Sequence, residues 1–269
     1  MSEAAPSPPP APPTLCCLMG MRLARVTRAE LLDRIFAALA AGQGGWLVTA
    51  NLDFLRRYVG DARVRTLYDA ADLCVADGAP LVWASRLQGY GLPERVTGSS
   101  LLWYLAERAA REARSLYLLG GTPASNQGAA RVLVERYPAL HICGRSCPLI
   151  SAPPTADELA SLQSELTALR PDILLVALGS PKQEEVIAAL RPHLPATWMV
   201  GVGASLSFAA GELDRAPVWM RRAGLEWLHR LAQEPSRLAR RYLIEDLPFA
   251  LRLFSAALKT RTRTRNPSR

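Results

Sequence analysis

The chain has 269 residues and 49% hydrophobic content, which is enough for one large α/β domain or two small ones with a sizeable core. Its net charge of +8 belongs to the C-terminal fifth: from Arg215 onward 13 Lys and Arg face 4 Asp and Glu, whereas the first 214 residues carry 19 against 20. The sequence has no helix-turn-helix, zinc-finger or RNP motif, which excludes nucleic acid as the partner of this basic segment. A membrane surface or a phosphate-bearing substrate is the better candidate.

The N-terminal region is predicted to be a disordered tail over residues 1–17. Its first 13 residues are rich in Pro, Ala and Ser and lack the basic start and apolar core of a signal peptide. No apolar stretch of the chain approaches the roughly 18 residues of a membrane span. The odd count of 5 Cys, without a Cys-x-x-Cys pair, indicates a reducing compartment. Neither the cysteines nor the 3 His have metal-ligand spacing, so we expect no metal and no cofactor.

After the tail, strand and helix patterns alternate along the chain. Strands are predicted at Met21–Val26, Trp46–Ala50, Leu73–Ala76, Leu116–Leu119, Leu140–Cys143, Ile173–Leu178 and Trp198–Val202. Helices are predicted over Arg28–Ala41, Leu52–Tyr58, Asp61–Ala70, Pro80–Leu87, Ser99–Glu112, Ser125–Tyr137 and Asp157–Leu169, and again after Pro181. Repeated β-then-α units predict a Rossmann-like parallel sheet with helices on both faces. We assign this α/β domain to residues 18–214 and a basic, all-helical appendage to residues 215–269.

Two strand ends carry polar residues that could serve a site or merely cap the next helix. Thr49 and Asn51 follow one strand, and capping is favoured there by roughly two to one because Asn strongly prefers N-cap positions. Asp77 ends the next strand and is followed by Gly78. A carboxylate at the carboxyl end of a buried parallel strand is well placed to act as a general base. For Asp77 the two readings are about even.

Three further strand ends bear glycine. Gly120 and Gly121 resemble a phosphate-cradling turn, and Gly203 ends a similar run. Neither is a Gly-x-Gly-x-x-Gly or Walker sequence, and many α/β turns contain glycine for its backbone freedom alone. The third strand end is Gly179, and the polar triplet Lys182, Gln183 and Glu184 follows it at the start of a helix, where open α/β sheets bind ligands.

The appendage combines arginines with apolar residues. Arg237, Arg240 and Arg241 stand at i, i+3 and i+4, with Arg230 further back, a spacing that suits a phosphate or diphosphate. The apolar residues of 243–254 and the basic end predict a helix that lies on a membrane surface. A solvated helix with a charged end is the alternative, at about one chance in three.

Seven ordered blocks of the sequence resemble the WecG/TagA/CpsF glycosyltransferases of bacterial cell-surface polymer synthesis. The resemblance runs from about residue 18 to 242, and its blocks read TANLDF (49–54), ADLCVADGAPLVWASRLQG (71–89), PERVTGSSL (93–101), LLGGTP (118–123), PDILLVALGSPKQE (171–184), MVGVGASLSFAAG (199–211) and RAPVWMRRAGLEWLHRLAQEPSRLARRY (215–242). It implies inverting transfer of a sugar from a UDP-sugar to an undecaprenyl-diphosphate-linked sugar, at the inner face of the cell membrane. Oligomeric state stays open, a homo-oligomer included.

The resemblance also implies roles for individual residues. Asp77 would be the catalytic base. The substrate-binding residues would be Thr49, Asn51, Gly120, Gly121, Lys182, Gln183, Glu184 and Gly203. The lipid diphosphate would be held by Arg215, Arg237, Arg240 and Arg241. The absence of an Asp-x-Asp motif argues against a divalent metal at the donor site.

The chain departs from the family pattern at three positions. Ala124 stands where the family often has Gly, and Ser100 and Ser207 stand where it often has Asp. The two missing carboxylates leave the donor sugar open between N-acetylmannosamine and the glucose of related exopolysaccharide transferases. Two other classes compete with a transferase: a non-catalytic binder of a nucleotide sugar or polyprenyl carrier, and a Rossmann oxidoreductase. Asp77 favours catalysis over binding, and the missing glycine fingerprint disfavours the oxidoreductase.

Overall fold

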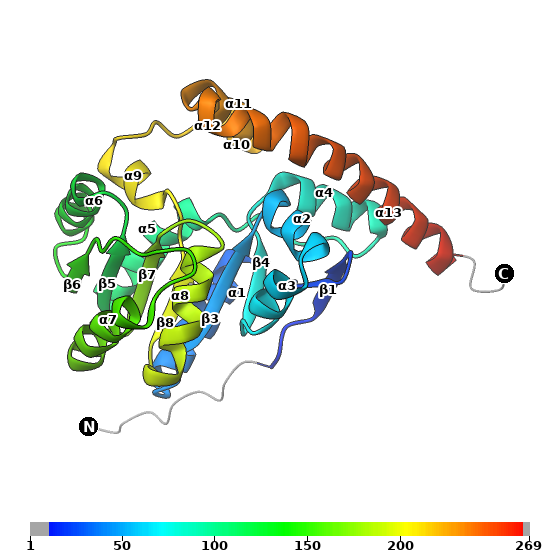
Figure 1. Ribbon diagram of the computed structural model, residues 1–269. Coiled ribbons are helices and arrows are strands. Elements are labelled where there is room, and N and C mark those ends of the chain that lie inside the picture. Colours follow the sequence, from blue (N-terminus) through cyan, green and yellow to red (C-terminus); the bar gives the residue numbers. More distant parts are fainter. Residues whose placement is uncertain (1–10, 266–269) are drawn as a thin grey trace.

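The computed structural model describes residues 11–265 and is built around a six-stranded parallel sheet (Figure 1). The strands are β3 (Gly45–Ala50), β4 (Leu73–Ala76), β5 (Ser115–Gly120), β6 (His141–Ser146), β7 (Ile173–Ala177) and β8 (Trp198–Gly201). Their order across the sheet is β4-β3-β8-β7-β5-β6, and every neighbouring pair is parallel. The carboxyl ends of all these strands therefore lie at one edge, and the predicted α/β fold is confirmed.

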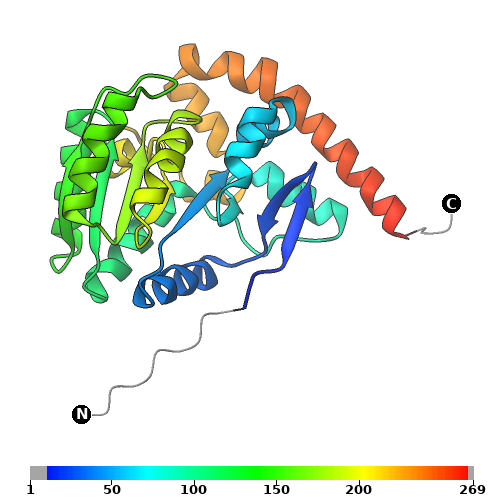
Figure 2. The ribbon, with the colours of Figure 1, turned by 60° about the horizontal axis from the view of Figure 1, so that its bottom comes forward.

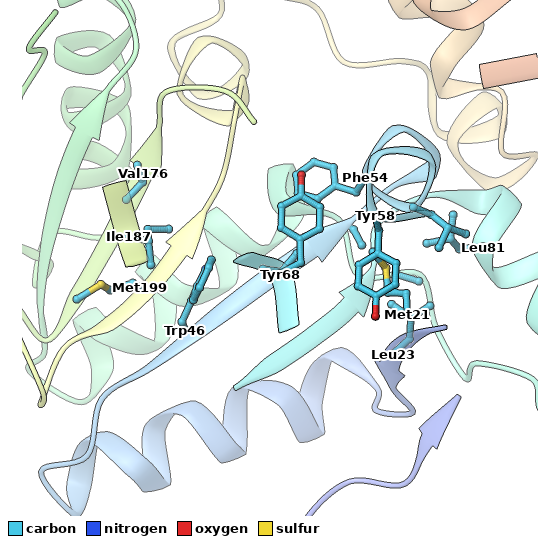
Figure 3. Close-up of a cluster of buried hydrophobic side chains, with 14 of the residues drawn as sticks. Met21, Leu23, Trp46, Phe54, Tyr58, Tyr68, Leu81, Val176, Ile187 and Met199 are labelled. Atoms are coloured by element: carbon cyan, nitrogen blue, oxygen red, sulfur yellow. The ribbon is translucent and has the colours of Figure 1, made fainter. Parts of the chain in front are cut away.

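Helices cover both faces of the sheet. One face carries α1 (Arg28–Ala40), α5 (Gly98–Arg111), α6 (Pro123–Arg136) and α9 (Ser205–Ala210). The other carries α2 (Leu52–Gly60), α3 (Ala62–Asp69), α4 (Ala79–Gln88), α7 (Ala156–Leu169), α8 (Lys182–Leu190) and a 3₁₀ turn at Arg191–His193. Successive β7 residues alternate between two cores: Leu174 and Val176 enter the core shown in Figure 3, and Ile173 and Leu175 enter the other. Both faces are buried, which explains the strand's unbroken apolar run.

The N-terminal boundary differs from the prediction of a tail to residue 17. Leu15–Leu18 forms β1, which pairs antiparallel with β2 (Met21–Ala24). The two-residue loop between them places Met19 and Gly20 at φ +48° and +96°, as a tight hairpin with the natural strand twist requires. Alternate residues of β1 are buried, so this segment is part of the core. Most of the predicted tail, residues 1–10, lies outside the described residues.

The appendage is all-helical, as predicted. It consists of α10 (Val218–Arg222), α11 (Glu226–Gln233), α12 (Pro235–Ala239), a π-helical segment, η2 (Arg240–Asp246), and α13 (Leu247–Arg265). In Figures 1 and 2 it crosses over the carboxyl edge of the sheet and returns along α4. Phe249, Leu253 and Ala257 of α13 are buried in the core on the α4 side. The prediction that residues 243–254 lie on a membrane surface is thus partly wrong, because one face of α13 belongs to the protein core.

Candidate active site

Two adjoining cavities lie at the carboxyl edge of the sheet, where the appendage crosses it. The larger has a volume of about 700 Å³ and the smaller about 380 Å³. Their shared lining consists of Asn51, Asp53, Phe54, Gln183, Gly203, Ala204, Arg230 and Arg241. These residues come from the ends of three strands and from the appendage, so the cavities are two lobes of one candidate site.

Asp77 directly follows β4 and lines the smaller cavity. Its Oδ2 accepts a hydrogen bond from the backbone N–H of Gly98, the first residue of α5, at 3.1 Å. The N-cap of α4 is Gly78, with no side-chain cap bond, so the carboxylate serves α5 and the cavity and does not cap α4. Burial raises the pKa of Asp77 to about 6, and the Gly98 hydrogen bond opposes that rise. A carboxylate with this pKa is ionised at neutral pH and is a better base than an exposed one.

Thr49 and Asn51 both line the smaller cavity. The Thr49 hydroxyl, near the end of β3, donates to the carbonyl of Gly201 at 3.3 Å and so ties β3 to β8. Asn51 is the N-cap of α2, where its Oδ1 accepts from the backbone N–H of Phe54 at 3.2 Å. Capping and cavity lining are therefore compatible at Asn51, and the two readings of this strand end coexist.

Of the two glycines in the turn after β5, one lines the larger cavity and the other does not. Gly121 lines that cavity, and a Cβ there would lie 2.8 Å from Ser125 Oγ. Gly120 lines neither cavity; its carbonyl accepts from Asn126 Nδ2 at 2.8 Å. Thr122 lines the larger cavity and caps α6, and its backbone N–H donates to Ser125 Oγ at 2.9 Å.

The polar triplet at the start of α8 also divides. Lys182 lines the larger cavity, and its Nζ donates to the carbonyl of Ile150 at 2.8 Å. Gln183 lines both cavities, and its Oε1 accepts from the backbone N–H of Gly203 at 3.2 Å. Glu184 lines neither cavity and is only 1% exposed. It stands behind Gln183, away from any ligand.

Two of the four predicted diphosphate-binding arginines line the larger cavity. Arg237 pairs with Glu234. Arg241 lines both cavities and lies 3.6 Å from Asp246 and 3.9 Å from Asp53, both of which are nearly buried carboxylates. The buried Nε atom of Arg241 is the atom that lies 3.6 Å from Asp246 Oδ2, slightly beyond hydrogen-bond distance.

The other two arginines line neither cavity. Arg240 is exposed, with its Nε 3.6 Å from Glu245. Arg215 donates to the hydroxyls of Ser99 and Ser100 at 3.1 and 3.0 Å. Arg215 therefore joins the appendage to the start of α5, at one of the two positions where the family often has Asp.

Several lining residues were not among the predicted site residues. Arg95 lines the smaller cavity and pairs with Glu226 of α11 at 3.3 Å. Trp83 of α4 contributes apolar wall, and Asp53 anchors arginines. Arg95 lies inside a block that resembles the family, but nothing local in the sequence marks it as a ligand contact. Arg230 was noted only as a neighbour of the other arginines, and it lines both cavities.

The outer surface of the appendage exposes large apolar side chains. They are Val218, Trp219, Leu228, Ile244, Leu251 and Leu258; Trp227, Leu243 and Leu247 are also exposed but line the smaller cavity. Ile244 and Leu251 are the most exposed of the group in η2 and α13, at 69% and 67%. Across residues 11–265, none of the helices combines the length and the apolar character that spanning a bilayer requires.

Comparison with known proteins agrees with the resemblance noted in the sequence. A chain from Bacillus spizizenii named N-acetylglucosaminyldiphosphoundecaprenol N-acetyl-beta-D-mannosaminyltransferase is 28% identical over 202 residues, which cover 75% of this chain and 76% of the relative. A Staphylococcus aureus protein of the same name is 28% identical over 225 residues, covering 83% and 86%. One from Bacillus subtilis is 27% identical over 197 residues, covering 73% and 75%.

The family profile covers nearly the whole described structure, including both sheet and appendage. The profile of the family described as Glycosyl transferase WecG/TagA/CpsF family matches residues 16–263. That span includes every strand end that borders the two cavities and the arginines that close over them. The chain is a glycosyltransferase and belongs to the WecG/TagA/CpsF family.

Proposed function

We propose that this enzyme transfers N-acetylmannosamine or a related hexose from a UDP-sugar to a sugar carried on undecaprenyl diphosphate. The observation that carries the proposal is the placement of Asp77 in a cavity that opens into a larger, arginine-lined one. The relatives named above add an acetylmannosaminyl group to N-acetylglucosaminyl-diphosphoundecaprenol, as their names state. The missing carboxylates at Ser100 and Ser207 keep glucose as the second donor candidate.

The reaction proceeds by direct displacement with inversion. Asp77 takes the proton of the acceptor hydroxyl as that oxygen forms a bond to the anomeric carbon of the donor. The bond between that carbon and the UDP oxygen breaks at the same time, and its electron pair leaves with UDP. One base and one displacement give a product of opposite anomeric configuration.

The larger cavity suits the diphosphate groups. Arg230, Arg237 and Arg241 line it, and guanidinium groups bind phosphate oxygens through paired hydrogen bonds. Gly121 and Thr122 line the same cavity, but their backbone N–H groups already donate to the carbonyl of Ala177 and to Ser125 Oγ. The arginines of this cavity would therefore hold the diphosphate of the lipid-linked acceptor.

The exposed apolar face of the appendage supports attachment to the inner surface of the cell membrane. Ile244 and Leu251 are exposed and lie close in sequence to the basic residues Arg240 and Arg252. Apolar side chains insert at the lipid headgroups, and cations are attracted to anionic lipid there. Such a surface would bring the two cavities to a lipid-linked acceptor.

The test is an assay with UDP-N-acetylmannosamine, UDP-glucose and UDP-N-acetylglucosamine, each with a short-chain N-acetylglucosaminyl diphosphate lipid. We expect disaccharide-lipid product with one donor and release of one UDP per product. Binding of a UDP-sugar without product from any donor would favour the alternative, a non-catalytic nucleotide-sugar or polyprenyl-carrier binder.

A further inference from the structure

Glu184 is a buried carboxyl group that touches no cavity. It stands in the first turn of α8 and is 1% exposed, and its neighbour Gln183 is 4% exposed. Burial of a carboxyl group is unfavourable unless hydrogen bonds compensate for lost water. We therefore expect the Glu184 carboxyl group, beside the active site, to have a role other than stabilising the fold.

The contacts of Glu184 lead to Gln183. Glu184 Oε1 accepts a hydrogen bond from Gln183 Nε2 at 2.6 Å, and Oε2 is buried without a partner among the described residues. At the other end of the same amide, Gln183 Oε1 accepts from the backbone N–H of Gly203 at 3.2 Å. The carboxyl group and the backbone thus fix the amide in one orientation, with its donor end toward Glu184 and its acceptor end toward β8.

The strand end is shaped around this pair. A Cβ at Gly201 would lie 2.5 Å from Gln183 Nε2 and 3.2 Å from Glu184 Oε1, so only glycine admits the amide here. The carbonyl of Gly201 accepts the hydroxyl of Thr49, which lines the smaller cavity beside Asp77. One run of hydrogen bonds and tight contacts therefore joins Glu184 to the wall that the two cavities share.

We propose that Glu184 is a positioning residue that acts through Gln183 and holds the Gly201–Gly203 turn between the two cavities. The proposal rests on the proposed transferase function. Burial raises the pKa of Glu184 to about 7, while the hydrogen bond from Gln183 opposes the rise. The neutral and the ionised carboxyl group can each accept the Gln183 hydrogen bond, so the positioning persists across that range.

The first experiment compares Glu184→Met with Glu184→Gln. Met fills a similar volume without a comparable acceptor, so kcat should fall by about 10-fold to 100-fold while KM for the UDP-sugar stays within about threefold. Gln retains a carbonyl that can accept from Gln183, so its kcat should stay within several-fold of wild type, roughly threefold to fivefold. The melting temperature of Glu184→Met should stay near that of wild type, because removal of a buried carboxyl group offsets the acceptor that Gln183 loses.

Two controls separate positioning from a general structural role. In a Gln183→Ala background, Glu184→Met should cause no further loss, because the residue through which Glu184 acts is gone. Hydrogen exchange at the Gly203 amide should accelerate in Glu184→Met by about tenfold or more, since the acceptor that protects it is no longer fixed. Glu135→Gln, an exposed carboxylate on α6, serves as the matched control.

The outcomes distinguish this proposal from the transferase function. Glu184→Met with wild-type kcat and unchanged exchange at Gly203 would overturn the positioning role and leave the transferase function intact. A kcat loss that is additive with Gln183→Ala, accompanied by a lower melting temperature, would also overturn it. Wild-type protein without transfer would refute the function, and the Gly203 exchange rate would still decide the positioning.

Discussion

Replacement of Asp77 by Asn tests the base through two independent readouts. Asn keeps the shape of Asp77 and can accept the Gly98 hydrogen bond, but it cannot take a proton. The value of kcat should therefore fall by on the order of 10²–10⁴-fold. In the wild type, kcat/KM should rise with pH through about 6, where Asp77 loses its proton, and level off above. This acid limb should be absent in the residual activity of the variant.

The second readout is stability. The pKa of Asp77 rises from 3.8 to about 6 on folding, so the folded state holds its proton more tightly than the unfolded state. The contribution of Asp77 to folding stability is fully present below pH 3.8 and is lost as the pH rises through about 6. At about 1.4 kcal/mol per pKa unit the loss is about 3 kcal/mol, and partial exposure reduces it to on the order of 1–3 kcal/mol. Asn carries no such penalty.

The assay is a thermal melt of both proteins at pH 8 and at pH 4, beside the transfer assay. Asp77→Asn should melt roughly 2–8 °C higher than wild type at pH 8, with a much smaller difference at pH 4. Transfer within a few-fold of the wild-type rate, or an acid limb that survives in the variant, would refute the assignment of Asp77 as base. An equal melting temperature at pH 8 would refute the buried, proton-favouring environment.

Three further predictions concern metal, phosphate and membrane. Transfer should persist in excess EDTA, because residues 11–265 contain no group of three His, Cys, Asp or Glu able to hold a metal ion; activity lost in EDTA and restored by Mg²⁺ or Mn²⁺ would contradict this. Arg241→Gln should lower kcat/KM for the lipid acceptor by roughly 10–100-fold, as loss of a charged hydrogen bond does, and Arg240→Gln much less, since Arg240 lines neither cavity. An equal loss in both would contradict the cavity assignment. The double variant Ile244→Glu with Leu251→Glu should bind anionic vesicles at least about tenfold more weakly, whereas Val134→Glu on α6 should bind as wild type. Co-sedimentation that does not separate the two would remove the membrane role of this surface.

Local sequence patterns predicted the sheet and its helices because recognisable turn residues follow the strands. The apolar run before Gly179 and the Asp77-Gly78 pair mark strand ends in sequence, and parallel pairing then brings those ends to one edge. No local sequence pattern shows which of two adjacent polar residues faces the cavities. Gln183 and Glu184 are adjacent polar residues. The packing of α8 against β8 places Gln183 at the cavities and Glu184 behind Gln183.

The arginine face was predicted with α-helical spacing throughout. In the structure Arg237 lies in the middle of α12, whereas Arg240 and Arg241 lie in the π-helical segment η2, whose wider turn shifts side chains around the axis. Arg237 and Arg241 therefore face the larger cavity while Arg240 faces solvent. Hydropathy likewise cannot separate Leu251, which is 67% exposed, from Leu253, which is 1% exposed, since core and membrane both favour leucine.

The appendage is a structural part of the catalytic domain as well as its cover. Asp53, at the start of α2, is nearly buried and pairs with Arg56 at 2.6 Å and Arg57 at 3.0 Å, while Arg56 also reaches Asp246 of η2 at 3.3 Å. Without the appendage Arg56 would lose Glu245 and Asp246, and the missing Leu253 would leave a hole against α4. Removal of residues 212–269 would therefore damage the α/β domain itself. Inactivity of such a truncated protein would not identify a membrane or diphosphate role, because the same deletion opens the core and removes two of the carboxylates that pair with Arg56. Single substitutions at Ile244, on the outer face of η2, leave both features in place and can separate attachment from catalysis.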